Sequence, residues 1–509
     1  MKTSHLLSDC LKNISSKYKN KVAVKTSDKQ YTYGELFKTA KKISWFIEKE
    51  KILNTDIIII LSRKDFLTYA TIIACILSGR TYSVIDSTSP KERLLKIIGK
   101  CKTNIIFSSK KEEINIKKKI INLKKIVTNI KSPNYKIKKI DDDKPCYLMF
   151  TSGSTGFPKG AIIRRESLLR FAKLCKKNFS LNKKDNLTSL NPLYFDNSIF
   201  DIFATFLNGL TLTVFTERDL KNPIDILKKI KKFKPTVWFS TPSLLIYLIN
   251  LKILDYKNIK PIKKIIFGGE AFPIDKLRKL FELDKSKSLY NVYGPTETTC
   301  ICSSYKIRPK DIYNKSKGYV SIGKIWDTFN FSLYQSKKKL SLKSKEVGEL
   351  YLIGPNVGSG YINDNIQSKK TFFGKSKNKK KFTGYKTGDL FTQDPKTKKL
   401  YFKGRKDSQI KVMGHRIELS EIEISLNEIN LVDEVVIFSK KIQDTNRIIA
   451  VVSTKKINSK EHIYKELRLK LPSYMIPSNI FLIRKMPKNA NGKIDRVKLK
   501  KIYEKKTII

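Results

Sequence analysis

The chain is poor in the residues that build metal centres and disulfide frameworks. It contains three histidines and seven cysteines among 509 residues, and no two cysteines form a Cys-x-x-Cys pair. Cys300 and Cys302 are too close for an ordinary disulfide or a zinc knuckle, and none of His5, His415 and His462 clusters with the cysteines. These absences argue against a zinc site, and reduced thiols are typical of a cytoplasmic protein.

Long apolar segments are also missing. The N-terminal stretch MKTSHLLSDCLKNISSKYKN has no apolar core of the kind that a signal peptide needs, and DIIIIL at 56–61 is only long enough for a strand. The sequence therefore predicts no membrane insertion and a cytoplasmic location.

Acidic residues are scarce, since 46 Asp and Glu stand against 104 Lys and Arg, which gives a formal net charge of +58. Such an excess is found in nucleic-acid-binding proteins. Here the positive charge is mostly lysine scattered along the chain, whereas a nucleic-acid site favours clustered arginine and stacking aromatics. We therefore expect no specific nucleic-acid partner, and we interpret the Lys, Ile and Asn content as a compositional bias.

Short β-branched runs alternate with helical patterns over most of the chain, which predicts parallel strands covered by helices. Strands are expected at 56–61, 81–86, 104–109, 236–240, 263–269 and 289–294, and helices at 66–79, at 91–101, from Leu244 and near Leu277. From about residue 401 the pattern changes to a hairpin followed by helix, strand, strand and helix. Because 509 residues are too many for one core, we predict an α/β protein with a separate C-terminal α+β domain.

The stretch YLMFTSGSTGFPKGAII (147–163) is rich in glycine and hydroxyl side chains and carries one lysine, Lys159. Glycine lets a backbone approach a ligand closely, and hydroxyl and N–H groups bind anions, so the stretch predicts a phosphate-binding loop. It is not a Walker loop, because Lys159 is followed by Gly160 and Ala161 rather than by Ser or Thr. Taken alone, the stretch could also be a mobile turn.

Further motifs follow the loop in a definite order. They are FDNSIFDIF (195–203), NVYGPTETT (291–299), GELYLIGPNVGSGYI (348–362), YKTGDL (385–390), GRKDSQIKVMGHRIELSEIE (404–423), LPSYMIP (471–477) and NGKIDR (491–496). With YTYGEL (31–36) before them, they resemble the motif series of the adenylate-forming superfamily over nearly the whole chain. Within it, the chain is similar to the amino-acid adenylation domains of nonribosomal peptide synthetases and to the D-alanine–carrier-protein ligases. One stretch, SGRTYSVIDSTSPKERL (78–94), departs from the family's usual Gly-Ala-Tyr-x-Pro.

The resemblance implies a fold and a reaction with two steps. A large N-terminal domain of layered sheets with helices (1–404) is expected to bind ATP and an amino acid, and a small mobile α+β domain (405–509) to act as a lid that carries the catalytic lysine. A carboxylate first attacks the α-phosphorus of ATP, which gives an acyl-adenylate and pyrophosphate. A thiol, usually the phosphopantetheine of a carrier protein, then takes the acyl group.

The resemblance also implies an ATP site. Three catalytic residues are implied: Lys493 would stabilise the charge that develops between the two anions, Glu297 would bind Mg²⁺, and Arg405 would contact the ribose or a phosphate. Asp389 would accept hydrogen bonds from the ribose hydroxyls. The other expected contacts are Thr151, Ser152, Gly153, Ser154, Thr155, Gly156, Lys159 and Gly160 of the loop, and Asn291, Val292, Tyr293, Gly294, Pro295 and Thr296 near the adenine. Outside their motifs, Lys493 could be a surface charge, Glu297 a helix N-terminal charge and Asp389 a turn residue.

The resemblance places the substrate's amino group at Asp196 of FDNS. A buried carboxylate facing the apolar chain of a fatty or aryl acid would be costly, so Asp196 favours an amino acid, although it could instead cap the helix that starts near Ile199. The matched pocket positions are Asn197, Phe200, Phe239, Ile266, Gly268, Val292, Cys300 and Ile301, with Lys493 at the carboxyl end. This apolar set suits an aliphatic side chain. Interpreting Gly268 as open space favours Ile, Val or Leu over D-alanine.

Asp407 matches the family's hinge between the two domains. No carrier segment is expected after Arg496, so a separate acyl or peptidyl carrier protein, typically acidic, is the expected partner of this basic chain. Three alternatives stay open at this stage: a D-alanine–D-alanyl carrier protein ligase for teichoic acid, an acyl-CoA synthetase, and a non-catalytic binding protein of the same fold.

Overall fold

The computed structural model describes residues 6–50, 52, 57–103, 105–110, 118–131, 133–153, 156–313, 319–342, 344–375, 382–442, 445–455, 459–489 and 494–506. The chain divides into two compact units. The N-terminal unit comprises Met1–Ser87, Lys100–Phe150 and Gly160–Lys406, and the C-terminal unit comprises Thr88–Gly99, Thr151–Lys159 and Asp407–Ile509. A large α/β unit and a small α+β unit agree with the predicted fold class. The functional boundary at residue 405 and the mobility of the small domain stay predictions.

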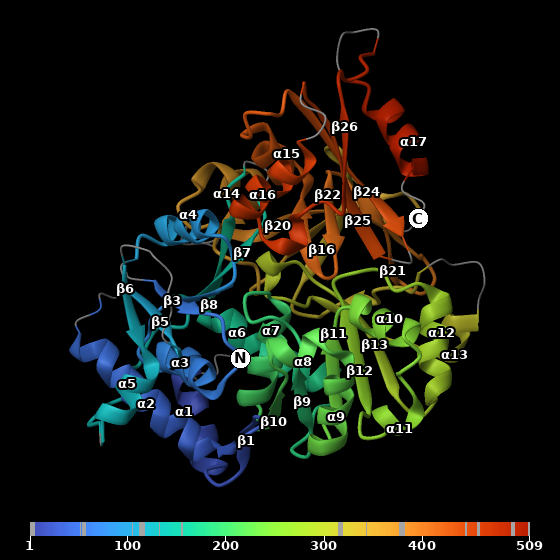
Figure 1. Ribbon diagram of the computed structural model, residues 1–509. Coiled ribbons are helices and arrows are strands. Elements are labelled where there is room, and N and C mark those ends of the chain that lie inside the picture. The colour runs from blue at the N-terminus through green and yellow to red at the C-terminus, as the bar shows by residue number, and fades with distance from the viewer. Residues whose placement is uncertain are drawn as a thin grey trace. The chain divides into compact units, whose positions relative to one another are not determined.

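Among the described residues, nine strands form the largest sheet of the N-terminal unit, in the order β15-β14-β13-β12-β11-β9-β10-β1-β2. Their bounds are Val22–Lys25 (β1), Gln30–Thr32 (β2), Asn186–Ser189 (β9), Thr211–Val214 (β10), Val237–Ser240 (β11), Lys264–Gly268 (β12), Ser288–Tyr293 (β13), Ser303–Lys306 (β14) and Lys324–Ile325 (β15). The run from β1 through β10, β9, β11 and β12 to β13 is parallel, as the alternating pattern predicts. Figure 1 shows β11, β12 and β13 side by side.

The two faces of this sheet bury different side chains, because successive residues of a strand point to opposite sides. Trp238 of β11 and Phe267 of β12 join one apolar cluster together with side chains of α10 (Pro242–Asn250) and α12 (Ile274–Leu283). Phe239 and Ile266, the next residues on the same strands, belong to a second cluster. Helices α10 and α12 therefore pack on one face, and the residues of the other face that were predicted to line the substrate pocket belong to a separate apolar cluster.

A second sheet of the N-terminal unit has the order β6-β5-β3-β4-β7-β8 in the described chain. Its strands are Ile58–Leu61 (β3), Tyr82–Ile85 (β4), Ile105–Ser108 (β5), Lys119–Asn122 (β6), Pro145–Thr151 (β7) and Lys159–Arg164 (β8). Helix α3 (Phe66–Leu77) connects β3 to β4 and is apolar on nearly all sides, as expected of a helix buried within a larger core. Its first turn is capped by Asp65, whose carboxylate accepts from Thr68 N–H at 2.9 Å.

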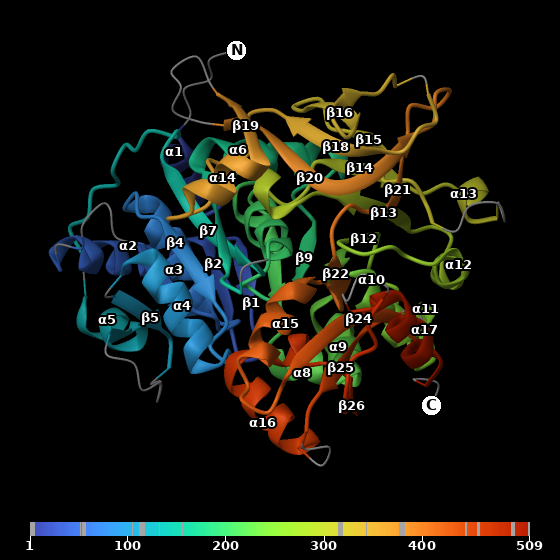
Figure 2. The same ribbon diagram turned by 90° about the horizontal axis from the view of Figure 1, so that it is seen from above.

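A third sheet pairs strands from the last part of the N-terminal unit (Figure 2). They are Asn330–Gln335 (β16), Lys338–Lys339 (β17), Gly348–Ile353 (β18), Phe372–Lys375 (β19), Phe382–Gln393 (β20) and Leu400–Arg405 (β21). The unit's remaining helical segments are Leu7–Lys17 (α1), Tyr33–Lys49 (α2), Leu123–Asn129 (α5), Arg165–Asn178 (α6), Asn197–Ile199 (α7), Phe200–Ala204 (η1), Glu217–Lys221 (α8), Pro223–Phe233 (α9), Tyr256–Ile259 (α11), Thr296–Thr298 (η2), Pro309–Tyr313 (α13) and Asn365–Thr371 (α14).

The C-terminal unit begins with a hairpin of β22 (Gln409–Val412) and β23 (His415–Glu418). Met413 and Gly414 form its two-residue turn with φ of +50° and +85°, and two successive positive φ angles are typical of the turn that matches strand twist. Helix α15 (Leu419–Asn427), β24 (Glu434–Ile442), β25 (Thr445–Ser453) and α16 (Lys460–Lys470) confirm the predicted helix, strand, strand and helix.

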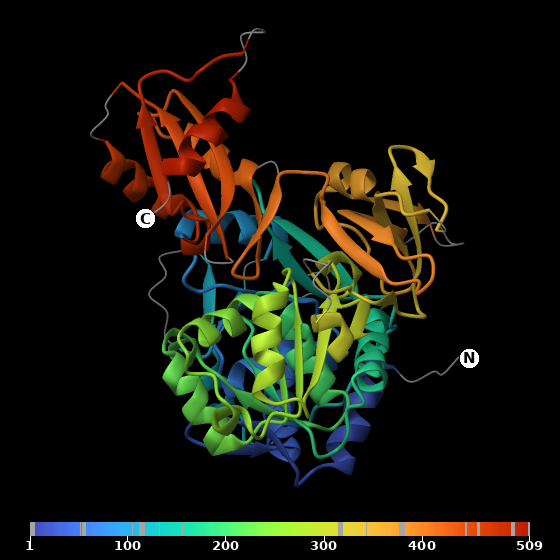
Figure 3. The same cartoon turned by 90° about the vertical axis from the view of Figure 1, so that its right-hand side faces the viewer.

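Three further elements of the C-terminal unit were not predicted: η3 (Ser473–Met475), β26 (Asn479–Ile483) and α17 (Arg496–Lys506). Strand β26 completes a sheet of order β24-β25-β26, seen in orange to red in Figure 3. Helix α4 (Lys91–Cys101) was predicted at these positions and begins in the same unit. No helix in the described part of either unit is long and apolar enough to cross a bilayer.

Candidate active site

Asp389 lies at the centre of a buried polar group in the N-terminal unit. Strands β20 and β21 pair with Asp389 directly opposite Arg405, and the guanidinium of Arg405 is ion-paired to the Asp389 carboxylate. The other carboxylate oxygen accepts from the Tyr293 hydroxyl of β13 at 2.6 Å, and burial raises the pKa of that hydroxyl. The structure therefore brings together three residues that the motifs YGPTETT, TGDL and GRKD predicted separately. Strand pairing, rather than a turn, holds Asp389 in place.

Asn291 and Val292 are the neighbours of Tyr293 on β13 and are also buried. The Asn291 side-chain amide donates to the carbonyl of Ser321 at 3.0 Å, which fixes its orientation. Gly294, directly after the strand, has no room for a side chain, because a Cβ there would lie 2.3 Å from the carbonyl oxygen of Cys300. This close approach is the local reason for a glycine before Pro295.

Glu297 is completely buried in the short helix η2. One carboxylate oxygen accepts from the Tyr361 hydroxyl at 2.7 Å, and the backbone carbonyl of Glu297 accepts from Gly358 N–H at 2.8 Å. The segment that contains Tyr361 is in turn bonded to β8, where Ile162 N–H donates to Gly360 O at 3.0 Å. The strand that follows the glycine-rich loop is thus tied to the segment that orients Glu297.

The backbone after Glu297 is left-handed at two successive residues that are not glycine. Thr299 has a φ of +66° and Cys300 a φ of +71°. Positive φ angles are uncommon in residues other than glycine, and residues that adopt them cluster at functional sites. The Thr299 hydroxyl donates to the Asn356 carbonyl at 2.8 Å, which helps to hold this conformation.

Asp196 does not cap a helix. It precedes the short helix α7, but its side chain makes no capping hydrogen bond. Its carboxylate instead accepts from the Thr296 hydroxyl at 2.6 Å, one residue before Glu297. The helix-cap explanation is therefore wrong for Asp196, and the half-buried carboxylate lies beside η2.

The predicted substrate-pocket residues gather on one face of the largest sheet. Phe239 pairs with Ile266, and Gly268 pairs with Val292, so these four share that face. The Phe200 ring packs edge-on against Phe239 with centroids 4.8 Å apart. Six of the eight predicted positions, namely Phe200, Phe239, Ile266, Val292, Cys300 and Ile301, lie in one apolar cluster.

A buried polar network supports this apolar group. Asn191 donates to both oxygens of Asp201 at 3.2 and 3.1 Å and to the Phe239 carbonyl at 3.1 Å. The Asn197 side chain reaches the Asn191 side-chain oxygen at 3.5 Å. Burial raises the pKa of Asp201, while the nearby Lys64 ammonium acts in the opposite direction.

Gly268 does not open space for a larger substrate. A Cβ at this position would lie 2.5 Å from Cγ2 and 2.6 Å from the carbonyl oxygen of Val292. The volume that a side chain would take is therefore already filled by β13. The expectation that Gly268 favours Ile, Val or Leu over D-alanine loses its basis.

Residues 151–153 and 156–159 of the glycine-rich stretch belong to the C-terminal unit. The Ser152 hydroxyl donates to the Arg416 carbonyl at 2.7 Å and accepts from Glu418 N–H at 3.0 Å. The Lys159 ammonium lies 3.5 Å from the Glu418 carboxylate. Gly156 has a φ of +77°, a conformation that favours glycine.

Glu421 of α15 contacts a backbone N–H of the loop that is predicted to bind phosphate. Gly153 N–H donates to its carboxylate at 3.0 Å, and the other carboxylate oxygen is ion-paired to Arg93 of α4. Both charged side chains are almost fully buried. The groups expected to bind phosphate thus already contact carboxylates of the same unit.

Thr151 ends β7 and Gly160 lies in β8, where a Cβ would lie 2.7 Å from Ile362. Asp407 is the first residue of the last segment of the C-terminal unit, and its side chain accepts from Gln409 N–H at 3.2 Å. Ser154, Thr155 and Lys493 lie outside the described residues. Their predicted roles stay predictions.

Sequence reasoning missed Tyr361, Arg93 and Glu421. Tyr361 and Glu421 stand inside quoted motifs, GSGYI and ELSEIE, so their position was available but their partners were not. Arg93 lies in the stretch that departs from the family pattern. Arg93 and Glu421 are 328 residues apart in sequence, so no local sequence pattern predicts their contact.

Comparisons with known proteins agree with this architecture. Residues 11–362 match the family of AMP-binding enzymes, and residues 421–493 match the AMP-binding enzyme C-terminal domain. A D-alanine–D-alanyl carrier protein ligase of Bacillus licheniformis is 27% identical over 504 residues, which cover 97% of this chain and 99% of that protein.

Two solved structures share the fold. A nonribosomal peptide synthetase protein with adenylation and PCP domains superposes with a TM-score of 0.85 at 19% identity, over 98% of this chain and 84% of that one. A double mutant of o-succinylbenzoate CoA synthetase from Bacillus subtilis gives a TM-score of 0.85 at 21% identity, over 97% of this chain and 98% of that one. With a family model matched over more than half of its length, the chain belongs to the AMP-binding enzymes, and its ligase chemistry forms AMP from ATP.

Proposed function

We propose that the protein is a free-standing ligase that activates an amino acid with ATP and transfers it to the phosphopantetheine thiol of a separate carrier protein. The observation that carries the amino-acid part is Asp196. It is not used as a helix cap, and it lies against Thr296, next to Glu297. A substrate ammonium would form an ion pair with this half-buried carboxylate, whereas a fatty acyl chain would place apolar groups against its charge.

The nucleotide is assigned to groups that are already oriented. Asp389, held by Arg405 and Tyr293, accepts hydrogen bonds from the ribose hydroxyls. Asn291 and the backbone of 292–296 line the adenine. The loop from Thr151 to Gly160 holds the β- and γ-phosphates, and its glycines let backbone N–H groups approach them.

Glu297 is suited to bind Mg²⁺. It is a fully buried carboxylate, one oxygen of which is already bonded to Tyr361. No group of three or more His, Cys, Asp or Glu that could hold a metal occurs among the described residues. This agrees with Mg²⁺, which is usually held by one or two carboxylates together with substrate phosphates. The ion would supply neutralisation of phosphate charge.

Lys493 carries the first half-reaction. An oxygen of the amino-acid carboxylate forms a bond to the α-phosphorus, and the bond to pyrophosphate breaks. Two anions approach one another in this step, and the Lys493 ammonium stabilises the negative charge that develops between them. In the second half-reaction, the carrier thiolate attacks the acyl carbon, and AMP leaves.

D-Alanine is a specific candidate for the substrate. Several relatives of nearly full length bear the name D-alanine–D-alanyl carrier protein ligase. In this chain Val292 fills the space beside Gly268, so that position does not argue for a larger side chain. One methylene is worth about 1–3 kcal/mol in such a pocket, and related amino acids are therefore expected to be activated as well.

Exchange of labelled pyrophosphate into ATP tests the proposal. Glycine, D-alanine, L-alanine, valine, leucine, isoleucine, benzoate and a fatty acid are compared with Mg²⁺ present. We expect amino-acid-dependent exchange, with a small or branched aliphatic amino acid leading. Exchange with only the fatty or aryl acids contradicts the role of Asp196, and no exchange with any acid favours a binding protein of the same fold.

Lys493→Ala provides the matched control for chemistry. It should lower exchange by about 10²-fold or more, because one preorganised charge donor is lost. Transfer from a supplied aminoacyl-adenylate to a carrier should be retained. An equal loss in both half-reactions would mean that the lysine is structural.

A further inference from the structure

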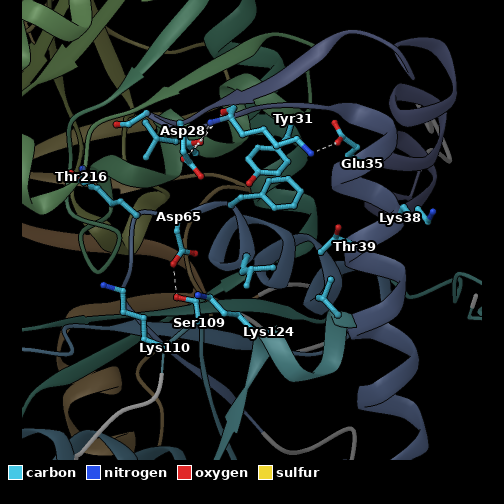
Figure 4. A pocket seen from close by; sticks show the side chains of 18 residues that line it. Asp28, Tyr31, Glu35, Lys38, Thr39, Asp65, Ser109, Lys110, Lys124 and Thr216 are labelled. Carbon is cyan, nitrogen blue, oxygen red and sulfur yellow. Dashed lines mark hydrogen bonds and ion pairs between the residues drawn. The ribbon is translucent and has the colours of Figure 1, made fainter. Parts of the chain in front are cut away.

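A pocket of about 600 Å³ opens in the N-terminal unit away from every residue assigned to ATP or amino acid (Figure 4). It lies at the carboxyl ends of β3 and β5, which are parallel neighbours. Residues 64–67 follow β3, residues 109 and 110 follow β5, and both segments line the pocket. A pocket of this volume is in the range of small-molecule sites.

The strand order makes this position a topological switch point. From β3 the chain runs to β4 on one side, while from β5 it runs to β6 on the other, as the order β6-β5-β3-β4 requires. Connections that leave neighbouring strands in opposite directions leave a crevice at their carboxyl ends. In open α/β sheets, ligands bind in that crevice.

The carboxylates of the lining are committed to local structure. Asp65 caps α3 and also accepts from the Ser109 hydroxyl, the bond drawn at the lower part of Figure 4. Glu35 accepts from Thr32 N–H at 2.8 Å and pairs with Lys29 at 3.0 Å. Asp28, the third carboxylate, accepts from a neighbouring threonine hydroxyl at 2.6 Å. Backbone and hydroxyl donors therefore satisfy these acids, and Glu35 alone also pairs with a lysine of the lining, Lys29.

The lysines outnumber these acids by five to three. Lys29 is taken by Glu35, and the buried Lys64 donates to the Ser189 carbonyl at 2.8 Å. Within the described residues, no carboxylate pairs with Lys38, Lys110 or Lys124. Figure 4 shows Lys110 and Lys124 on the side of Ser109 and Asp65, and Lys38 apart on α2. The pocket thus keeps two exposed ammonium groups from separate elements near one side.

The rest of the lining is apolar. The rings of Tyr31 and Phe66 are stacked with centroids 3.7 Å apart and planes inclined by 8°. Leu67, Val127 and Val214 add aliphatic surface. We propose that this pocket binds a small organic anion, with a phosphate or carboxylate head at Lys110 and Lys124 and an aromatic or aliphatic body against Tyr31 and Phe66.

Titration calorimetry on the full chain tests this site. The probes are phenyl phosphate and benzoate, with aniline and phenol as cationic and neutral analogues of the same ring. We expect saturable binding of at least one of the two anions, and the tighter of them identifies the head group. Lys110→Glu with Lys124→Glu should weaken that binding about tenfold or more, the effect of losing about 1.4 kcal/mol.

The matched control is Lys125→Glu with Lys131→Glu. These two residues are exposed, lie in or next to the same helix and do not line the pocket, yet the change in net charge is the same. Control binding should equal that of the unchanged chain, and both double variants should retain amino-acid-dependent pyrophosphate exchange. The proposal is overturned if neither anion binds, if both double variants weaken binding equally, or if aniline or phenol binds as tightly as the anions.

Discussion

Two buried ion pairs, one in each unit, are built in different ways. Asp389 and Arg405 stand opposite one another on paired strands and are 16 residues apart in sequence. Glu421 and Arg93 come from helices 328 residues apart, and no strand ladder joins them. The first pair forms wherever β20 and β21 pair. The second requires two separate stretches of chain to associate.

The difference also concerns what each pair leaves for a ligand. Asp389 keeps its partners when a ribose hydroxyl donates to it, because a carboxylate accepts several hydrogen bonds. Glu421 instead uses Gly153 N–H, the kind of donor that a phosphate needs. Gly153 N–H can donate to Glu421 or to a phosphate oxygen, but not fully to both. The predicted ribose contact, Asp389, can therefore accept a further hydrogen bond with its partners in place, while the predicted phosphate loop already donates to a carboxylate of the protein.

Breaking the strand-held pair should have the largest effect. Asp389→Ala leaves the Arg405 guanidinium and the Tyr293 hydroxyl without their buried acceptor, so the free energy of opening β20 and β21 should fall by about 4 kcal/mol. Amide hydrogen exchange of β20 and β21 measures this free energy of opening. Tyr293→Phe removes one hydrogen bond only and should cost about 1 kcal/mol. Equal costs in the two variants would contradict the importance of the ion pair.

Breaking the ion pair of the C-terminal unit with Glu421→Ala should have a smaller effect. The free energy of local opening should fall by about 3 kcal/mol, which amide hydrogen exchange would show as faster exchange at residues 151–153 and 416–421. Tripolyphosphate should restore part of this protection, because its oxygens can accept from Gly153 N–H and Arg93. It should restore none in Asp389→Ala. Glu428→Ala, which removes an exposed pair with Lys470, should change stability by under about 1 kcal/mol. Protection unaffected by tripolyphosphate would mean that Glu421 does not occupy a phosphate position.

A substitution at Asp407 tests whether both half-reactions need the same backbone conformation at the predicted hinge. Asp407→Pro fixes φ near −65° and should lower carrier loading by about tenfold or more, with adenylate formation nearly unchanged. Separate assays of exchange and of loading measure this. Asp407→Ala removes the same bond to Gln409 N–H without locking the backbone and should load normally. If the alanine and proline variants load alike, the backbone lock is not the cause.

A pH dependence is also expected, and it is confined to the C-terminal unit. Burial lowers the pKa of His415 to about 3, and its ring stacks on Tyr474 with centroids 3.8 Å apart. Between pH 6.5 and 3 the unfolded chain binds a proton that the folded imidazole does not. The free energy of unfolding should therefore fall as the pH drops, by up to about 1.4 kcal/mol per pH unit.

His415→Phe keeps an aromatic ring on Tyr474 and removes this titration. Denaturation of the C-terminal unit at pH 7, 6 and 5 should show a shallower loss of stability in the variant. Parallel curves for the two proteins would show that His415 does not titrate differently on folding.

The sequence predicted the strands and helices whose apolar runs are unbroken, such as β3, α3, β12 and β13. It did not predict β26 or α17, because NIFLI is short and the RVKLKK stretch is too polar to show an apolar face. Among site residues, Asp389, Tyr293 and Arg405 were named from motifs. The contact of Asp389 with Arg405 follows from strand pairing, whereas Tyr293 reaches Asp389 from a strand of another sheet.

What the sequence could not provide was packing. Gly268 was interpreted as space, but Val292 fills it, and only the register of β12 and β13 reveals this. The left-handed backbone at Thr299 and Cys300 has no sequence signal either, because neither residue type favours positive φ. The Arg93 contact with Glu421 depends on association of distant segments, which periodicity does not encode.

The two-faced sheet has a consequence for how such a protein changes over generations. On β11 and β12, Phe239 and Ile266 are predicted pocket positions, while their chain neighbours Trp238 and Phe267 pack in the cluster with α10 and α12. Neighbouring positions on these strands are therefore expected to be under different selective constraints. Substitutions at every second position can redirect substrate choice while the intervening positions preserve the scaffold, so new specificities are reachable by single steps that leave the fold intact.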